Sequence, residues 1–321
     1  MTALLETRGL TKHFQQQGGL ARLRGLDRPL VAVEDVSLSI ERGETLGLVG
    51  ESGSGKSTFG RLLLQLEDPT SGDILFEGES VLGRGERSAR ELRKRIQVIF
   101  QDPYSSLNPT MTVRQMLEEV LAVHRIVPKE ARRARVADLL ERVGLAPEFA
   151  GRRPHQFSGG QRQRIGIARA LAVEPEFIVA DEAVSALDVS VQAQVLNLMM
   201  RLQEDLGLTY LFISHNLTVM RHISEHVAVM YLGRIVEQSP TETLFAEPLH
   251  PYTQALLKAA PKPEPRRRAI TPAVSGDIPS PVDRPAGCHF HPRCKFAMDV
   301  CRVEYPAARR VGDAVVACHL Y

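Results

Sequence analysis

The chain has 321 residues, of which 43% are hydrophobic and 24% are charged, and its formal net charge at pH 7 is +2. This length and balance predict a globular protein with a full core, built as one large domain with an appendage or as two domains. The small net charge argues against a nucleic-acid or strongly acidic partner, and the lack of any run of about 18 apolar residues argues against a membrane-spanning helix.

The N-terminal region predicts two strands separated by a loop. Its first residues lack a charged stretch followed by a long apolar run, so we expect no signal peptide and a cytosolic location. Residues 7–14 and 30–41 predict strands, and residues 15–28, rich in Gln, Gly and Arg, predict a loop. Phe14 is a candidate to stack on an adenine ring, although its position fits a phenylalanine of the core equally well.

A glycine-rich loop at residues 50–58 fits the phosphate-binding pattern G-x-x-x-x-G-K-[ST]. It lies between a predicted buried strand, 45–49, and a predicted helix, 59–66, which is the context that the pattern requires. Glycines allow successive N–H groups to point at one anion, and the start of the helix adds its positive dipole end. Lys56 is expected to reach the β- and γ-phosphates, and the Ser57 hydroxyl to bind Mg²⁺. The residues expected at the nucleotide are Gly50, Ser52, Gly53, Ser54, Gly55, Lys56, Ser57 and Thr58.

Gln101 follows the next predicted strands and is a candidate for the Mg²⁺ or attacking-water shell. A polar side chain at the carboxyl end of a strand stands where α/β sheets bind ligands. An ordinary loop glutamine is the alternative, and without the other motifs it would be preferred. The neighbouring predictions are strands at 73–76 and 96–100, a charged helix at 88–95, an irregular loop at 104–112, and two helices at 113–126 and 128–143 that form a helical insertion between strands.

A second candidate anion site precedes the helical pattern at 165–172. The sequence Ser158-Gly159-Gly160-Gln161 offers a capping serine and two glycines that leave backbone N–H groups open at the start of a helix. By itself such a sequence is more often a plain capped turn.

The predicted strand at 177–180 ends in two adjacent acids, Asp181 and Glu182. In phosphate-loop NTPases an Asp in this place holds Mg²⁺, and Glu182 would then stand beside the γ-phosphate, placed to polarise a water. After a predicted helix at 191–206 and strand at 209–213, His215 is a candidate sensor of the γ-phosphate, although a single His is usually structural. Two further strands, 228–231 and 234–238, are predicted to close the domain.

Taken together, these motifs resemble the full set of an ATP-binding-cassette (ABC) ATPase over residues 5 to 260. The resemblance implies a phosphate-loop NTPase fold of the α/β class, with a mixed sheet core, an antiparallel β subdomain and a helical subdomain at about 102–172. It also implies a head-to-tail dimer in which the phosphate loop of one subunit and the Ser158 helix start of the other hold the same ATP. The implied roles are Glu182 as general base, Asp181 and Gln101 at Mg²⁺ and water, His215 at the γ-phosphate, Asp188 in coupling the halves, and Phe14 at the adenine. Ala183 departs from the family, which more often has Pro there, and little effect is expected.

The C-terminal tail holds every cysteine of the chain, Cys288, Cys294, Cys301 and Cys318. Nine of the 20 prolines lie between residues 248 and 285, which predicts an extended linker that includes the start of a short helix at 248–257. Four clustered cysteines in a cytosolic protein favour a metal over disulfides, either Zn²⁺ or an iron–sulfur cluster, although the tight C-x2–4-C pairs of zinc sites are missing. His289, His291 and His319 are possible substitute ligands, and four unligated buried thiols are the alternative.

The tail, with residues 287–294 and 316–319, looks like the C-terminal extension of oligopeptide/dipeptide and nickel importer ATPases, and residues 101–109 and 186–194 resemble the same subfamily. In that subfamily cysteines so placed can hold a [4Fe–4S] cluster. The resemblance implies an ATPase domain at 1–260 and an extension at 261–321. It further implies the cytoplasmic face of the membrane, a second homologous ATPase subunit, two permeases and an external solute-binding protein.

The expected function is therefore ATP hydrolysis coupled to the import of di- or oligopeptides. Nickel and glutathione import remain alternatives, because the sequence of a motor subunit does not name the solute. A soluble ABC ATPase acting on nucleic acid or ribosomes is a third hypothesis, but such proteins usually carry two cassettes or a long coiled coil, and this chain has neither.

Overall fold

The computed structural model describes residues 3–15, 29–102, 106–259 and 279–321. The chain forms two compact units. The phosphate-loop unit consists of Leu5–Ser39, Thr45–Ser80 and Ser214–Tyr321, and the helical unit consists of Met1–Leu4, Ile40–Glu44 and Val81–Ile213. The predicted loop at 15–28 lies almost wholly outside the described residues, as do residues 103–105 and the part of the predicted 248–285 linker at 260–278.

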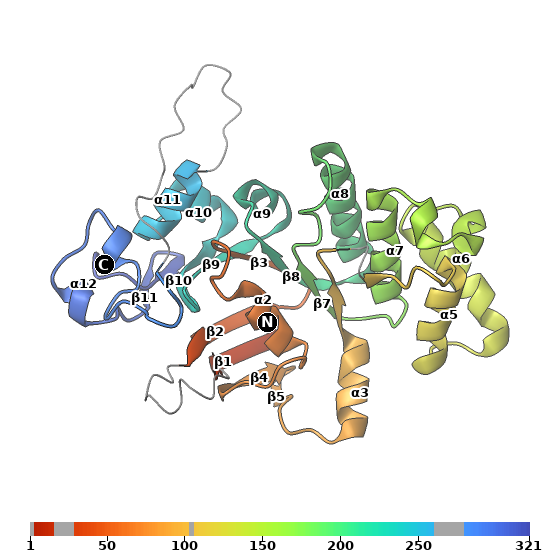
Figure 1. Ribbon diagram of the computed structural model, residues 1–321, viewed down its shortest axis with the longest axis horizontal. Helices are drawn as coiled ribbons and strands as arrows, with labels where there is room; N and C mark the ends of the chain where they lie inside the picture. Colours follow the sequence, from red (N-terminus) through yellow and green to blue (C-terminus); the bar gives the residue numbers. More distant parts are fainter. Residues whose placement is uncertain (1–2, 16–28, 103–105, 260–278) are drawn as a thin grey trace, which may run out of the picture. The chain divides into compact units, whose positions relative to one another are not determined.

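The phosphate-loop unit contains an antiparallel sheet with the strand order β2-β1-β4-β5 (Figure 1). Its strands are β1 (Ala3–Phe14), β2 (Leu30–Glu41), β4 (Ser71–Phe76) and β5 (Glu79–Ser80). In β2 the side chains of Val36, Leu38 and Ile40 are buried and alternate with exposed Ser37 and Ser39. This is the alternation expected of a strand with one face on the core.

A second group of strands in the same unit has the order β11-β12-β10-β9-β3. β3 (Thr45–Val49) runs parallel to β9 (His226–Tyr231), and β9, β10 (Arg234–Pro240), β12 (Ala314–Val316) and β11 (Arg309–Val311) follow in antiparallel pairs. All five residues of β3 are buried, as a short parallel strand requires. The helices of this unit are α2 (Lys56–Leu63), α9 (Leu217–Ile223), α10 (Thr241–Ala246), α11 (Pro251–Ala259) and α12 (Val300–Val303).

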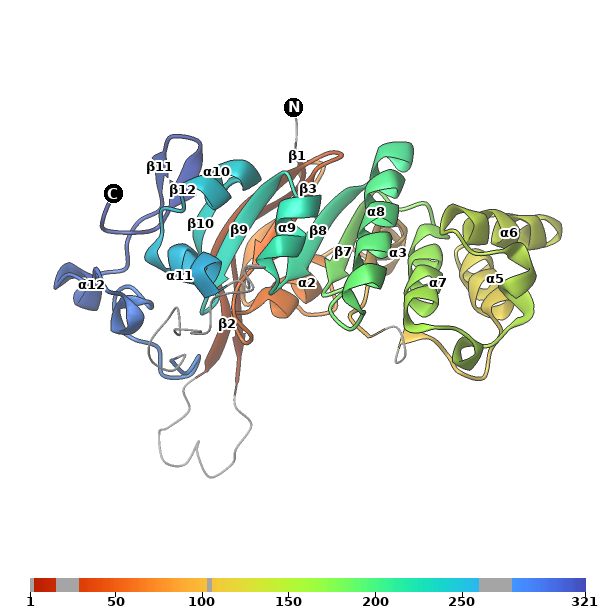
Figure 2. The same ribbon diagram turned by 90° about the horizontal axis from the view of Figure 1, so that it is seen from above.

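The helical unit contains three parallel strands in the order β8-β7-β6. They are β6 (Ile96–Ile99), β7 (Phe177–Asp181) and β8 (Thr209–Ser214), and α3 (Glu86–Arg95) precedes β6. α5 (Val113–Val123) and α6 (Arg132–Arg142) correspond to the predicted helical insertion, and they pack against each other and against α7 (Gly159–Leu171) (Figure 2). α8 (Val189–Leu206) ends at Gly207, whose left-handed φ of 65° terminates the helix.

The C-terminal tail differs most from the sequence prediction. The sequence predicts that a short helix begins at 248–257 within an extended linker. The structure forms this helix as α11 but packs it into the core, where Tyr252 and Thr253 are 0% exposed. Pro251 is the first residue of α11, where the missing N–H costs no hydrogen bond. The hairpin β11–β12, which was not predicted, pairs with β10 and places the described tail in the same unit as the phosphate loop. Within the described ranges, no helix combines the length and the hydropathy needed to cross a membrane.

Candidate active site

The phosphate loop connects β3 to α2, as the sequence predicts. Gly55 has φ of +106°, and a Cβ on it would lie 2.1 Å from the backbone oxygen of Ala32. A Cβ on Gly50 would lie 2.2 Å from the backbone oxygen of Met230. Neither backbone oxygen can rotate away, so both positions require glycine. The loop is thereby closed tightly over neighbouring strands and leads directly into the N-terminus of α2.

Lys56 is 5% exposed and folds back over the loop. Its Nζ donates to the carbonyl oxygen of Gly50 at 2.8 Å and to that of Glu51 at 3.0 Å. The ammonium is thus positioned by the loop that would hold the phosphates, with its charge directed into the turn. Ser57, the predicted Mg²⁺ ligand, is half-buried in the first turn of α2, and Ser52 and Gly53 are exposed at the tip of the loop.

Three residues far from the motif support the loop, and sequence reasoning missed them. The phenolic oxygen of Tyr252 accepts a hydrogen bond from the Glu51 N–H at 2.9 Å. The Arg293 guanidinium donates to both carboxylate oxygens of Glu51, at 2.8 and 3.0 Å. The backbone oxygen of Ser54 accepts from Gly233 N at 2.8 Å. The only sequence signal of this support is the acidic residue that follows Gly50, since its partners lie about 200 residues away.

Two other predicted residues belong to the same unit. His215 is exposed and directly follows β8, as expected of a side chain at the carboxyl end of a strand. Phe14 is half-buried at the end of β1, and the Lys12 Nζ lies 4.9 Å from the centre of its ring.

Two of the predicted catalytic residues, Gln101 and Glu182, lie in the helical unit and contact each other. The Gln101 Nε2 donates to the Glu182 Oε2 at 2.8 Å, although the two residues are 81 positions apart. Parallel pairing of β6 with β7 places the carboxyl ends of both strands at the same edge, which brings Gln101, Asp181 and Glu182 to one place. Gln101 is exposed, while Asp181 and Glu182 are half-buried.

Glu182 adopts a backbone conformation that is uncommon for a residue with a side chain, with φ of +49°. Three hydrogen bonds hold it there: its N–H donates to Ile213 O at 2.9 Å, and its carbonyl oxygen accepts from both N and Oγ of Ser185. Strained backbone that is fixed by its surroundings is typical of functional positions, where it aims a side chain. In this case it directs the Glu182 carboxylate toward the Gln101 amide.

The Ser158 sequence forms a reciprocal cap at the start of α7. The Ser158 Oγ accepts from Gln161 N at 3.4 Å, and the Gln161 Oε1 accepts from Ser158 N at 3.0 Å. Ser158 and Gly159 are exposed, whereas Gly160 is buried against Val191, whose Cγ1 would lie 2.3 Å from an added Cβ. The helix start is thus rigid and presents its outer face to solvent. Asp188, the residue expected to couple the halves, is exposed at the start of α8.

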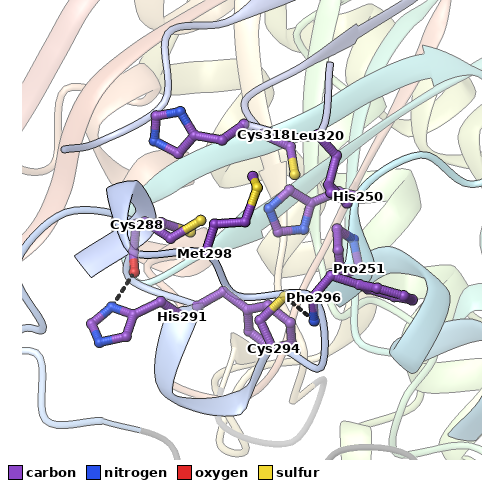
Figure 3. Close-up of a pocket in the computed structure, with 12 residues that line it drawn as sticks. His250, Pro251, Cys288, His291, Cys294, Phe296, Met298, Cys318 and Leu320 are labelled. Atoms are coloured by element: carbon purple, nitrogen blue, oxygen red, sulfur yellow. Dashed lines mark hydrogen bonds between the residues drawn. The ribbon is translucent and has the colours of Figure 1, made fainter. Parts of the chain in front are cut away.

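The four cysteines line one small pocket together with His250, Phe290 and Met298 (Figure 3). His291 and His319 also line the pocket, but the His291 Nδ1 contacts Cys288 O at 2.9 Å and the His319 Nε2 contacts Glu304 O at 3.0 Å. Burial raises the pKa of Cys288 to about 11, and it also raises the pKa values of Cys294 and Cys318.

The pocket is not a preformed metal-ion site. Its cavity has a volume of about 10 Å³, the space of about one water molecule. Across the described part of the chain, no group of three or more His, Cys, Asp or Glu residues is arranged to hold a metal ion. The four cysteines therefore surround a narrow space, and burial favours the protonated thiol at Cys288, Cys294 and Cys318.

Comparisons with known proteins agree with these motifs. The family model "ABC transporter" matches residues 33–185, and the model "Oligopeptide/dipeptide transporter, C-terminal region" matches residues 236–301. A probable peptide ABC transporter ATP-binding protein of Sinorhizobium fredii is 53% identical over 320 residues, which cover 99% of this chain and 90% of the relative. The oligopeptide transport ATP-binding protein AppF of Bacillus subtilis is 51% identical over 324 residues, covering 99% and 97%.

Solved structures give the same fold. The protein cbiO1 of Clostridium perfringens, part of the ABC transporter complex cbiONQ, matches with a TM-score of 0.66 and 27% identity, covering 77% of this chain and 92% of that one. A dimeric ATP-binding cassette in a post-hydrolysis state, bound to ADP and phosphate, matches with a TM-score of 0.64 and 28% identity, covering 74% and 98%.

Proposed function

The chain belongs to the family of ABC transporter ATP-binding proteins, and on this basis we propose that it is the ATP-hydrolysing subunit of an importer of di- or oligopeptides. The proposal rests on two features that occur together in this chain. The complete set of nucleotide-site motifs is followed by a C-terminal region of the oligopeptide/dipeptide transporter type. Relatives that match along nearly the whole chain carry names of peptide transport ATPases.

The phosphate loop fits the triphosphate of ATP on steric and electrostatic grounds. Gly50 and Gly55 bring the backbone of the loop close to neighbouring backbone, where any side chain would collide. A glycine-rich turn that leads into a helix can direct backbone N–H groups at an anion. Lys56 is already directed into the turn, and it exchanges carbonyl partners for phosphate oxygens when the nucleotide binds. Ser57 and Asp181 would hold Mg²⁺, which when bound neutralises phosphate charge.

Glu182 is the proposed general base. Its carboxylate is oriented by the Gln101 amide and by the fixed backbone of residues 182–185, so it is positioned before substrate arrives. It accepts a proton from the attacking water, and Gln101 orders that water, while His215 contacts the γ-phosphate. The exposed start of α7 at Ser158 supplies N–H groups to the ATP held by a second subunit, and Asp188 lies at that subunit contact. Phe14 packs against the adenine.

The proposed assembly rests on the similarity to peptide ABC transporter ATPases and on the exposed start of α7 at Ser158. The ATPase pairs with a second, similar subunit, lies at the cytoplasmic face of the membrane beneath two permeases, and works with an external solute-binding protein. ATP binding closes the pair of ATPases and hydrolysis reopens it. The insertion formed by α5 and α6 transmits this motion to a permease.

A transport assay in the source organism tests the proposal and its closest alternatives. A strain without this chain is expected to lose uptake of a labelled tripeptide. Wild-type chain restores uptake and the Glu182→Gln variant does not. Loss of nickel or glutathione uptake with intact peptide uptake would reassign the solute. Co-purification with RNA or ribosomes, and no transport defect, would favour the nucleic-acid hypothesis and reject the importer.

We also propose that Cys288, Cys294, Cys301 and Cys318 hold a metal centre, with a [4Fe–4S] cluster preferred to Zn²⁺. The support is their shared pocket. A single Zn²⁺ needs sulfurs about 2.3 Å from one point, whereas each cysteine of a cluster binds a different iron. Because the cavity is narrow, binding of a cluster would move the loops apart. Anaerobically purified protein should contain about four irons per chain with broad absorbance near 400 nm; zinc alone, or no metal, would reject the cluster.

A further inference from the structure

Arg293 makes a buried, bidentate ion pair with Glu51 of the phosphate loop. Its side chain is 5% exposed, and both of its terminal nitrogens donate to the carboxylate of Glu51. The guanidinium also lies 5.9 Å from the ring centre of Tyr231 and 6.0 Å from that of Phe290. The hydrogen bonds with Glu51 raise the pKa of Arg293 further above its ordinary value. A fork of two parallel bonds fixes orientation as well as distance.

Glu51 is in turn the residue on which the shape of the loop depends. Its carbonyl oxygen accepts from the Lys56 Nζ at 3.0 Å and from Ser54 N at 3.2 Å. Its N–H donates to Tyr252 at 2.9 Å. The backbone on both sides of Glu51 and its side chain are therefore held at once. Rotating the Glu51 carboxylate away from Arg293 would therefore also disturb the Glu51 carbonyl oxygen that positions Lys56.

A second arginine from the tail contacts β2, the strand that lies against Gly55 of the loop. Arg284 donates to the Glu34 carboxylate at 2.5 Å and also to the backbone oxygen of Val31. The next residue of β2, Ala32, supplies the carbonyl oxygen that closes on Gly55. Arg293 thus contacts the loop itself and Arg284 contacts the strand packed against it, and both arginines come from the C-terminal segment, residues 279–321.

The position of Arg293 depends on the fold of the cysteine-bearing turn. Arg293 lies in a single 3₁₀ turn, His291–Arg293, between Cys288 and Cys294. The turn is fixed by His291 N donating to Cys288 O at 3.0 Å, and Cys288 N donates to Cys301 O at 2.9 Å. A change in the backbone around the cysteines would therefore move Arg293.

We propose that Arg293 is a positioning residue of the ATP site: through Glu51 it holds the phosphate loop in its binding conformation, so that the C-terminal segment sets the affinity for MgATP. This inference rests on the proposed ATPase function. It assigns to the tail a direct effect on the nucleotide site of its own chain. Arg293 does not contact the nucleotide and acts only through the loop.

The test measures MgATP binding and the kinetics of hydrolysis on the full-length chain. Arg293→Gln is expected to raise the KM for ATP and the Kd of MgATP about 10-fold, the equivalent of one charged hydrogen bond, with kcat at saturating ATP within about twofold. Arg293→Lys keeps the charge but cannot form two parallel hydrogen bonds with the carboxylate. Its KM for ATP and its Kd of MgATP should therefore lie between those of wild type and Arg293→Gln. Arg302→Gln, which removes an exposed charge from the same segment, is the matched control and should bind as wild type does.

A double-mutant cycle separates positioning from simple stabilisation. Glu51→Gln should raise the KM as Arg293→Gln does, and the double variant should be no worse than either one, because both remove the same contact. A KM equal to that of wild type in Arg293→Gln and Arg293→Lys, whatever their melting temperatures, would overturn the inference, as would fully additive effects. Failure of the proposed function is distinct, because the wild-type chain itself would then bind no MgATP.

Discussion

Replacing Gly55 with Ala tests whether the phosphate loop is shaped by steric contact with β2. The new Cβ would lie 2.1 Å from the Ala32 carbonyl oxygen, far inside van der Waals contact, and φ of +106° is a conformation that residues with side chains rarely adopt. The conformational cost is about 1–2 kcal/mol. The collision adds about 1–3 kcal/mol, because a backbone oxygen cannot swing aside as a flexible side chain would.

Gly78→Ala is the matched control for this variant. Gly78 has φ of +79°, and nothing lies within 4 Å of an added Cβ, so it carries the conformational cost alone. Gly55→Ala should therefore melt lower than Gly78→Ala by about 4–8 °C, taking about 2 kcal/mol for the collision, and only Gly55→Ala should lose MgATP binding. Thermal unfolding by circular dichroism and a nucleotide-binding titration measure both effects. Equal melting temperatures for the two variants would refute the steric explanation.

Three further predictions concern the helical unit. Glu182→Gln retains a carbonyl oxygen for the Gln101 hydrogen bond but cannot take a proton, so MgATP binding should persist while phosphate release slows by about 100-fold or more; unchanged turnover would remove Glu182 from its role. Ser158→Ala loses the side-chain cap of α7 and should destabilise the protein by about 1 kcal/mol in chemical denaturation, whereas Ser158→Gly should cost only a few tenths, about 0.3 kcal/mol. Hydrogen bonding to Arg95 lowers the pKa of Glu176, so this pair adds stability above the unfolded pKa of 4.5 that is lost as the pH falls below it. The difference in melting temperature between pH 7 and pH 4 should therefore be smaller for Glu176→Gln than for wild type. An equal difference in the two proteins would contradict the assignment.

The elements nearest the nucleotide site were predictable because their signals are local. The strand at 45–49 and the strand at 30–41 have the predicted bounds, since a short apolar run and an alternating pattern are set by neighbouring residues. The cap at Ser158 was likewise expected, because a serine just before a helical pattern can accept a hydrogen bond from an N–H of the first turn. Gln101 and Glu182 were each expected at the carboxyl end of a strand, and the structure adds that a hydrogen bond joins them, because β6 and β7 are parallel neighbours.

The tail was predictable only in composition. Its cysteines were expected to gather, but the hairpin at 309–316 that joins it to β10 consists of two strands of three residues, too short to show a pattern. The start of helix α11 was predicted, but the prolines around it gave no indication that the helix is buried. Its burial depends on contacts with Tyr231 and Phe290, whose ring centres lie 4.6 and 5.4 Å from that of Tyr252.

The sequence by itself determined the chemistry of this protein, because a phosphate loop, a strand-end acid pair and a capped helix start are each encoded within about ten consecutive residues. Only the tertiary structure decided that Arg293 binds Glu51 and that Arg284 binds Glu34, across 242 and 250 residues of chain. Such pairs leave no periodicity or spacing in the sequence. They form because strand pairing brings the tail beside the phosphate loop, where a buried arginine must find a carboxylate.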